Sequence, residues 1–221
     1  MSNEMKISSE LIDRQLVHLG NGAVIDESAV IGYLPGRGNN QVLKIGTSAR
    51  IRSGTVIYGG TRIGCNIETG HNVVIREEND IGDKFRIWNN SVVDYGCKIG
   101  NNVKIHTNVY VCQFSIIEDN VFLAPGVTLA NDLHPGCPDS LECMRGPYIN
   151  KGAQIGINCS VLPRVVIGEY SVIGSGSVVT RDIPAGVVAY GNPAQVVCDV
   201  SDISCTTGLR NKPYDDFEWR I

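Results

Sequence analysis

The sequence has few aromatic residues, little charge imbalance and no long apolar run, and each shortage excludes a class of protein. Aromatic residues make up 6% of the 221 residues, and the formal net charge is −4. Without an excess of lysine and arginine the chain lacks a surface suited to a phosphate backbone, so we expect no nucleic-acid partner. No apolar stretch approaches the length that crosses a bilayer, and the first six residues lead into none. We therefore expect a cytoplasmic protein without a membrane partner.

Cysteine pairs of the CxxC type and histidine clusters are also missing. The eight cysteines are scattered at positions 65, 97, 112, 137, 143, 159, 198 and 205. Several fall where the repeat described next needs a small inward side chain, so we expect reduced thiols with ordinary packing roles. The four histidines, His18, His71, His106 and His134, are far apart in the chain.

The sequence does contain a repeat in which aliphatic residues recur at every sixth position. Ile, Val or Leu occupies fourteen of the fifteen positions taken at every sixth residue from 45 to 129, and the register resumes from Ile149 to Val179. Two residues before many of these aliphatics stands another small or branched side chain, such as Ala49 or Val73. Residues two apart in a strand share a face, so both members of a pair point the same way. Gly and Asn between the pairs tolerate the positive φ of a tight corner.

One such unit cannot bury its apolar face alone, whereas a stack of them forms a continuous core. With this pattern, residues 20 to 197 resemble the hexapeptide-repeat acyltransferase superfamily. The resemblance implies an all-β fold, a left-handed parallel β-helix with three units to a coil. We expect five coils from residues 45–134, two more from 149–184, and one domain over 1–197. A tail at 198–221, with Tyr214, Phe217 and Trp219, is expected to pack on the array or on a neighbouring subunit.

The register breaks twice. Between Leu129 and Ile149 the chain has 14 residues more than the repeat needs, so we expect an ejected loop near 131–148. Inserted loops on solenoids usually form one wall of a binding site. A second break between Ile31 and Ile45 predicts a loop near 33–43, which could also contact substrate.

The resemblance implies transfer of an acetyl group from acetyl-CoA to a sugar, which needs a base for the nucleophile and donors for the oxyanion. Histidine is the natural base at neutral pH. His134, within Asn131-Asp132-Leu133-His134-Pro135, resembles the His-Pro loop of the galactoside and maltose O-acetyltransferases, whose histidine is the catalytic base.

His106 competes with His134. The stretch from Cys97 to Val109 resembles the nucleotide-amino-sugar N-acetyltransferases, which commonly have Gln-Asn-Asn where this chain has His106-Thr107-Asn108. Their later Thr-Asn step matches Ala130-Asn131 here. Several members of that group have no evident side-chain base. The candidate catalytic residues are therefore His134, His106 and Asn131.

Positions 18 apart should stack in a three-sided coil. Trp88 then lies beneath His106, and Glu77, Tyr95, Gln113 and Asn131 form one outward column. Arg76 could face a phosphate or form an internal ion pair. The candidate substrate-binding residues are His71, Arg76, Glu77, Glu78, Trp88, Tyr95, Gln113 and Asp132.

The end of the array resembles the superfamily's terminal coil and its closing Gly-x-Pro-Ala motif, here Gly191-Asn192-Pro193-Ala194. The resemblance implies that the pantetheine arm of acetyl-CoA runs in a groove between subunits, with Arg181 near the CoA phosphates. Small residues there would let the arm touch the backbone. The candidate cofactor-binding residues are Gly156, Gly174, Gly176, Arg181, Asn192 and Pro193.

The resemblance also implies a homotrimer with sites at its interfaces. We interpret the chain as an N-acetyltransferase for a nucleotide-linked amino sugar in cell-surface glycan biosynthesis. Two alternatives are O-acetylation of a sugar hydroxyl and a non-enzymatic β-helix scaffold. A γ-type carbonic anhydrase shares the fold but binds zinc through closely spaced histidines. Here 35 and 28 residues separate the successive histidines from His71 to His134, so no metal is expected.

Overall fold

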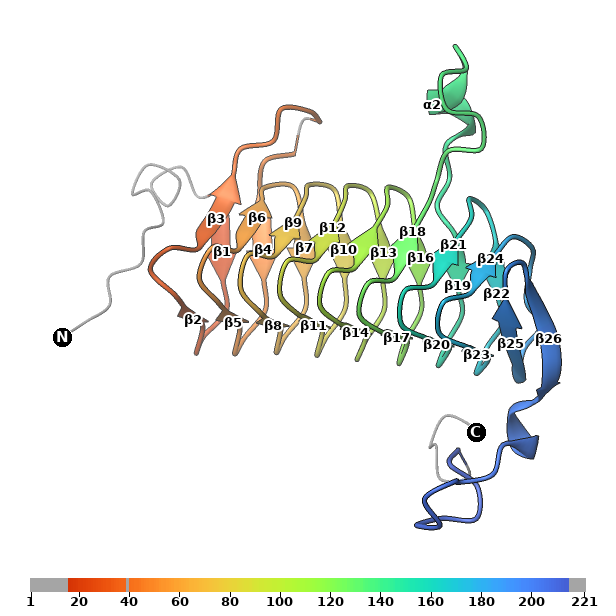
Figure 1. The fold of residues 1–221 in the computed structure, drawn as a ribbon. Helices are drawn as coiled ribbons and strands as arrows, with labels where there is room; N and C mark the ends of the chain where they lie inside the picture. Colours follow the sequence, from red (N-terminus) through yellow and green to blue (C-terminus); the bar gives the residue numbers. More distant parts are fainter. Residues whose placement is uncertain (1–15, 39, 215–221) are drawn as a thin grey trace.

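The computed structural model describes residues 16–38 and 40–214. The chain winds into a left-handed β-helix whose short strands form three parallel sheets, and two loops project from it on the same side (Figure 1). The expected fold class is confirmed. Within the described residues no helix is long and apolar enough to span a membrane.

Each coil contributes one strand to each of three sheets. Sheet A contains β1 (Val17–Leu19), β4 (Leu43–Ile45), β7 (Arg62–Ile63), β10 (Asp80–Ile81), β13 (Lys98–Ile99), β16 (Ile116–Ile117), β19 (Tyr148–Ile149) and β22 (Val166–Ile167). Sheet B contains β2 (Val24–Ile25), β5 (Arg50–Ile51), β8 (Glu68–Thr69), β11 (Arg86–Ile87), β14 (Lys104–Ile105), β17 (Phe122–Leu123), β20 (Gln154–Ile155), β23 (Val172–Ile173), β25 (Val187–Gly191) and β26 (Ala194–Asp199). Sheet C contains β3 (Val30–Tyr33), β6 (Val56–Tyr58), β9 (Val74–Ile75), β12 (Val92–Val93), β15 (Tyr110–Val111), β18 (Thr128–Leu129), β21 (Ser160–Val161) and β24 (Val178–Val179).

The turns between sheets form three corners along the helix. The AB corner follows each sheet A strand, the BC corner follows each sheet B strand, and the CA corner follows each sheet C strand. Strand pairing confirms the coil length, since Ile63 pairs with Ile81 and Ile81 with Ile99. Ile117 pairs directly with Ile149, so the extra residues between them leave the coil without changing its register.

The core is a ladder of the paired inward residues. The aliphatics at every sixth position are buried, and so are the small residues two positions earlier, such as Ala49, Val73 and Val103. Phe85 takes one of these positions and is fully buried. All eight cysteines are free thiols, and three of them, Cys97, Cys112 and Cys159, are buried.

The corners impose a left-handed backbone at a fixed place in each unit. Every sixth residue from Ser48 to Gly126 has a positive φ. Glycine and asparagine fill many of these positions, as the sequence predicted, because they adopt this region at little steric cost. Glu78 and Phe114 adopt it as well, with φ of 60° and 62°. The stacking of successive coils therefore overrides the local preference of the side chain at these corners.

The C-terminal end is closed by a hairpin. Strand β25 continues sheet B, and β26 pairs antiparallel with β25. A short 3-10 helix (Val200–Asp202) follows. The division expected at 197/198 falls within β26 and stays a prediction. Phe217 and Trp219 of the expected tail lie outside the described residues.

Candidate functional site

Both loops leave the coil at the CA corner. The first loop, residues 34–42, connects β3 to β4, and the ejected loop, residues 130–147, connects β18 to β19. Figure 1 shows both projecting from the same side of the helix, the ejected loop with the short helix α2 (Ser140–Cys143). The CA corner between them carries a continuous set of polar side chains.

The first part of this set joins the 34–42 loop to the coil. Arg76 donates two hydrogen bonds to the Glu77 carboxylate, at 3.1 Å from Nε and 2.8 Å from Nη2. Glu77 is fully buried, and Arg37 from the loop places its Nε 3.8 Å from Glu77 Oε1. The Arg37 guanidinium also lies 3.5 Å from the centre of the Tyr95 ring, a cation–π contact.

The second part centres on Asp94, which is 7% exposed. Its Oδ1 accepts the Tyr95 N–H at 2.8 Å and lies 3.4 Å from Arg76 Nη1. Its Oδ2 accepts hydrogen bonds from Tyr110 Oη at 3.0 Å and Gln113 Nε2 at 2.6 Å. Gln113 Oε1 in turn accepts a hydrogen bond from Asn131 Nδ2 at 2.6 Å. The polar side chains of the CA corner therefore form a series from Arg37 in the first loop to Asn131. Asn131 and Arg145 are where the ejected loop joins the coil, and we call this place the neck of the loop.

Two expectations about these residues need correction. Glu77 and Tyr95 were expected to face outward, but both are buried, because Arg76 and Arg37 cover them from the corner. Of the two alternatives for Arg76, the internal ion pair is the one observed, since both Glu77 and Asp94 hold its guanidinium. Glu78 remains exposed beside Gly38 of the first loop.

The ejected loop is organised by its own first residues. Asp132 Oδ1 accepts the His134 backbone N–H at 2.9 Å, and its Oδ2 accepts the Ser140 hydroxyl at 2.6 Å. The hydrogen bond from Ser140, with that from His134, lowers the pKa of the Asp132 carboxyl. The Arg145 N–H closes the neck on the Asn131 carbonyl at 2.9 Å. Asp132 therefore shapes the loop, and the exposed His134 side chain is carried at its surface.

His106 lies at a different corner. It follows β14 at the BC corner, near Trp88 of the preceding coil, and His71 lies at the same corner one coil before Asn89. The His106 Nδ1 accepts the Thr107 N–H at 3.0 Å, and the ring packs edge-on against Phe122. In the neutral ring this leaves the proton on Nε2, so His106 offers a donor and no free lone pair. The candidates His134 and Asn131 belong to the same loop, and His106 lies at another corner of the chain.

The candidate donor residues gather at the BC corner near the C-terminal end. Gly156 and Gly174 occupy the same column as His106, two and three coils further on. A Cβ on Gly156 would lie 2.6 Å from the Ser175 nitrogen, and one on Gly174 would lie 2.7 Å from Tyr190 Cβ. The Gly191 N–H donates to Ser177 Oγ, which holds the Asn192-Pro193 turn beside Gly176.

Arg181 is separated from this group. It follows β24 at the CA corner and is exposed. The structure therefore brings Gly156, Gly174, Gly176, Asn192 and Pro193 to one edge of sheet C. Asn131, Asp132, His134 and Arg181 lie at the other edge.

Between the two edges, the outward column of sheet C is apolar over its first half. This valine column is exposed or half-buried and consists of Val30, Val56, Val74 and Val92, after which Tyr110, Thr128, Ser160 and Val178 follow in the same column. Such a column leaves apolar surface facing solvent in one chain.

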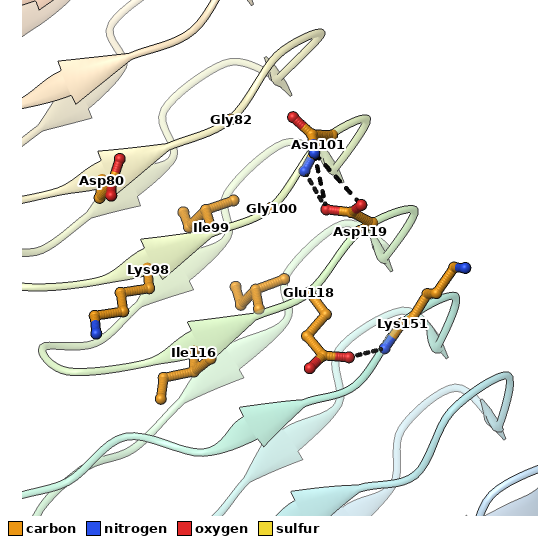
Figure 2. Close-up of a pocket in the computed structure, with 11 residues that line it drawn as sticks. Asp80, Gly82, Lys98, Ile99, Gly100, Asn101, Ile116, Glu118, Asp119 and Lys151 are labelled. Carbon is orange, nitrogen blue, oxygen red and sulfur yellow. Dashed lines mark hydrogen bonds between the residues drawn. The ribbon is translucent and has the colours of Figure 1, made fainter.

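A groove on sheet A lies apart from all of these residues. Its volume is about 490 Å³, and Figure 2 shows it beside Lys98, Ile116, Asn101, Asp119 and Lys151. Asp119 Oδ1 accepts the Asn101 N–H at 2.6 Å, and Glu118 accepts the Lys151 N–H at 2.9 Å. These groups serve to hold the AB corner together. Within residues 16–38 and 40–214, no three His, Cys, Asp or Glu side chains are grouped to hold a metal.

Sequence reasoning missed Arg37, Asp94 and Tyr110. The spacing of 18 could have found Asp94, because it stands one coil after Arg76 with the opposite charge. It could not have found Arg37, because the loop carries this residue out of the repeat.

Sequence comparisons place the repeat among known proteins. Residues 80–113, 96–131 and 146–181 match the family described as bacterial transferase hexapeptide (six repeats). Galactoside O-acetyltransferase of Lactococcus lactis is 37% identical over 103 residues, which are 45% of this chain and 50% of that protein. The dTDP-3-amino-3,6-dideoxy-α-D-galactopyranose 3-N-acetyltransferase of Aneurinibacillus thermoaerophilus is 48% identical over 65 residues, 28% of this chain and 31% of that protein. The matches thus span half or less of these relatives.

Solved structures give a looser likeness. A galactoside acetyltransferase in complex with coenzyme A has 29% identity and a TM-score of 0.43, covering 65% of this chain and 66% of that one. A perosamine N-acetyltransferase variant from Caulobacter crescentus, in complex with CoA and GDP-perosamine, has 23% identity and a TM-score of 0.43, covering 66% and 57%. By its strand register the chain is a left-handed β-helix protein, and its repeats are similar to those of the bacterial transferase hexapeptide family and of sugar acetyltransferases.

Proposed function

We propose that the protein is an acetyl-CoA-dependent sugar acetyltransferase that acetylates an amino group on a nucleotide-linked amino sugar, a reaction of cell-surface glycan biosynthesis. The observation that carries this proposal is the sequence similarity of the repeat to both sugar N- and O-acetyltransferases. The ejected loop carries the exposed His134 and the oriented amide of Asn131, two groups suited to the transfer. The eight free thiols are typical of a reducing compartment and support a cytoplasmic location.

O-acetylation of a sugar hydroxyl is the second candidate. The galactoside O-acetyltransferase similarity extends over a longer stretch than the N-acetyltransferase similarity. His134 is followed by Pro135, as in the His-Pro loop that the sequence resembles. The two reactions differ in the nucleophile, and His134 would take the proton in either one.

The transfer requires three actions from the protein. The acceptor amine or hydroxyl attacks the thioester carbonyl of acetyl-CoA, so a C–N or C–O bond forms while the C–S bond breaks. His134 takes the proton that the nucleophile loses and returns it to the sulfur, so CoA leaves as the thiol. A backbone N–H of a late coil stabilises the oxyanion.

The BC corner carries the glycines of the proposed donor column. A Cβ at Gly156 or Gly174 would lie within 2.7 Å of atoms that the same chain already packs there, so glycine lets these segments approach closely. Gly176, Asn192 and Pro193 border the same edge. We assign the pantetheine arm of acetyl-CoA to this column and the CoA phosphates to Arg181.

This assignment requires more than one chain. The donor residues lie at one edge of sheet C and His134 at the other, so a second subunit must bring the two edges together. A closed cyclic trimer, with the valine column covered at each interface, satisfies this requirement. We therefore propose a homotrimer with three equivalent sites.

Replacement of Val74 by lysine tests the trimer. The charge would be desolvated in the covered valine column, so we expect trimers to dissociate and transferase activity to be lost with them. Light scattering during size-exclusion chromatography measures the mass of the wild type and of the variant. The matched control is Lys98→Ala on sheet A, which should leave the mass unchanged. Wild-type protein that runs as a monomer would contradict the proposed assembly.

Acetyl-CoA itself tests the enzyme class. A ligand at 100 times its Kd stabilises a folded protein by about 2.7 kcal/mol, so acetyl-CoA should raise the melting temperature measurably. Thiol release from acetyl-CoA should then be assayed with UDP- and dTDP-linked amino sugars and with a galactoside. Amino sugars should give the faster release. A protein that neither binds acetyl-CoA nor releases thiol with any acceptor would be a β-helix scaffold.

A further inference from the structure

Asn131 lies at the neck of the ejected loop, and its side-chain amide ends a chain of hydrogen bonds that starts at Asp94. Gln113 Nε2 donates to Asp94 Oδ2 at 2.6 Å, and Asn131 Nδ2 donates to Gln113 Oε1 at 2.6 Å. The amide of Gln113 therefore stands between a carboxylate and a second amide. Each group in this chain limits how the next one can be turned.

The polar groups around Asp94 all act as donors. The Tyr95 N–H and the Tyr110 hydroxyl donate to it, and the Arg76 guanidinium lies 3.4 Å away. Burial raises the pKa of the Tyr110 phenol, and the hydrogen bond to Asp94 raises it further, so this hydroxyl keeps its proton. In these contacts the Asp94 oxygens therefore act only as acceptors.

That carboxylate fixes both amides. Gln113 must turn its NH₂ towards Asp94, which leaves its carbonyl oxygen towards Asn131. Asn131 must then turn its own NH₂ inward, and its Oδ1 is left pointing away from Gln113. Among the hydrogen bonds of the described residues, none goes to Asn131 Oδ1. The neck of the loop therefore presents a fixed acceptor.

We propose that Asp94 and Gln113 are positioning residues that hold the Asn131 carbonyl oxygen towards the nucleophile of the acceptor sugar. This inference rests on the proposed function. The group bound there must donate a hydrogen bond, as an amine or a hydroxyl does before it attacks. The Asn131 oxygen then directs the lone pair of that group without taking its proton.

The presence of two hydrogen-bond acceptors favours an amine as the nucleophile. His134 belongs to the same loop and also needs an N–H or O–H from the nucleophile. A neutral primary amine has two N–H groups, one for Asn131 Oδ1 and one for His134. A hydroxyl has a single hydrogen and can serve only one of the two. The arrangement thus points to amino sugars within the proposed substrate class.

Two substitutions of Gln113 test whether the direction of its hydrogen bonds matters, and not only the presence of a polar side chain at this position. Gln113→Lys keeps a donor to Asp94 but offers only donors to Asn131, so the Asn131 amide must reverse. Gln113→Glu offers an oxygen to Asn131, and its protonated carboxyl donates to Asp94 as the Gln113 amide does. Gln113→Lys therefore reverses the hydrogen bond between residue 113 and Asn131, and Gln113→Glu preserves its direction.

Steady-state assays at pH 6 with acetyl-CoA and dTDP- or UDP-linked amino sugars test the inference. For Gln113→Lys we expect kcat to fall about 10-fold or more. Its KM for acetyl-CoA should stay unchanged, and Gln113→Glu should stay within a few-fold of the wild type. Tyr110→Phe removes another donor to Asp94 without touching the amides, and serves as the matched control. Equal losses in both Gln113 variants, or no loss in either, would overturn the inference.

A second measurement does not depend on activity or on a variant that folds. In the wild type, one side-chain proton of Gln113 and one of Asn131 should exchange slowly with solvent, because each is held in a buried or half-buried hydrogen bond. Nuclear magnetic resonance of the ¹⁵N-labelled protein resolves these amide groups. Fast exchange of both Asn131 protons would sink the inference. If the wild type transfers no acetyl group to any acceptor but the protons are protected, the proposed function fails while the orientation of Asn131 stands.

Discussion

Replacement of His134 by alanine should lower kcat for acetyl transfer by about 100-fold or more, because a positioned general base contributes about 10²- to 10⁴-fold. The imidazole is exposed at the surface of the ejected loop. The loop is held by Asp132, Ser140 and the Arg145 N–H, through the backbone of His134 and not through its ring. The variant should therefore keep its melting temperature and its affinity for acetyl-CoA while losing its rate.

His106→Ala is the matched control for this experiment. The His106 ring already accepts the Thr107 N–H, so its Nε2 carries a proton and cannot act as a base without breaking that contact. We expect only a few-fold change in kcat. The pH profile gives an independent check, since the acidic limb of kcat/KM that a general base produces should vanish in His134→Ala. A large loss in His106→Ala, with His134→Ala unaffected, would reverse the assignment of the base.

The coil could be predicted from sequence because its buried side chains and its strand pairing repeat with the same period. Ile63, Ile81 and Ile99 stand in register because each must bury its side chain on the one below it. The same spacing predicts that the ejected segment leaves a gap of 14 residues, and Ile117 pairs with Ile149 across that gap. Local chemistry alone would not suffice, since Phe114 occupies a corner that favours Gly or Asn.

The site was harder to predict because the burial and orientation of a side chain at a corner depend on which other side chains pack over it. Glu77 stands in the predicted column, yet Arg76 and Arg37 enclose it. Arg37 contacts the Tyr95 ring at the CA corner, but it belongs to a loop whose path the repeat does not specify. The column of Gln113 and Asn131 was predicted, whereas the hydrogen bonds that orient these amides depend on Asp94.

Glu77→Ala should be the most destabilising change to the polar network, lowering the free energy of unfolding by about 3–5 kcal/mol, the usual cost of removing one partner from a buried ion pair. The Glu77 carboxylate is fully buried and accepts two hydrogen bonds from Arg76, whose side chain is 34% exposed. Without it, the Arg76 guanidinium keeps Asp94 at 3.4 Å and the faces of Tyr58 and Tyr95 as contacts. The Arg37 side chain also loses the charge that holds its loop over Tyr95.

Urea unfolding of Glu77→Ala against Arg62→Ala tests this prediction, with both variants at one protein concentration. Arg62 pairs with Asp80 at 2.7 Å through an equally good hydrogen bond, but both side chains are more than half exposed. An exposed pair contributes about 0–1 kcal/mol, so Arg62→Ala should shift the midpoint little. Glu77→Gln retains the shape and two acceptor sites on one oxygen, and should fall between the two. Equal shifts in Glu77→Ala and Arg62→Ala would mean that burial adds nothing to the Glu77 pair.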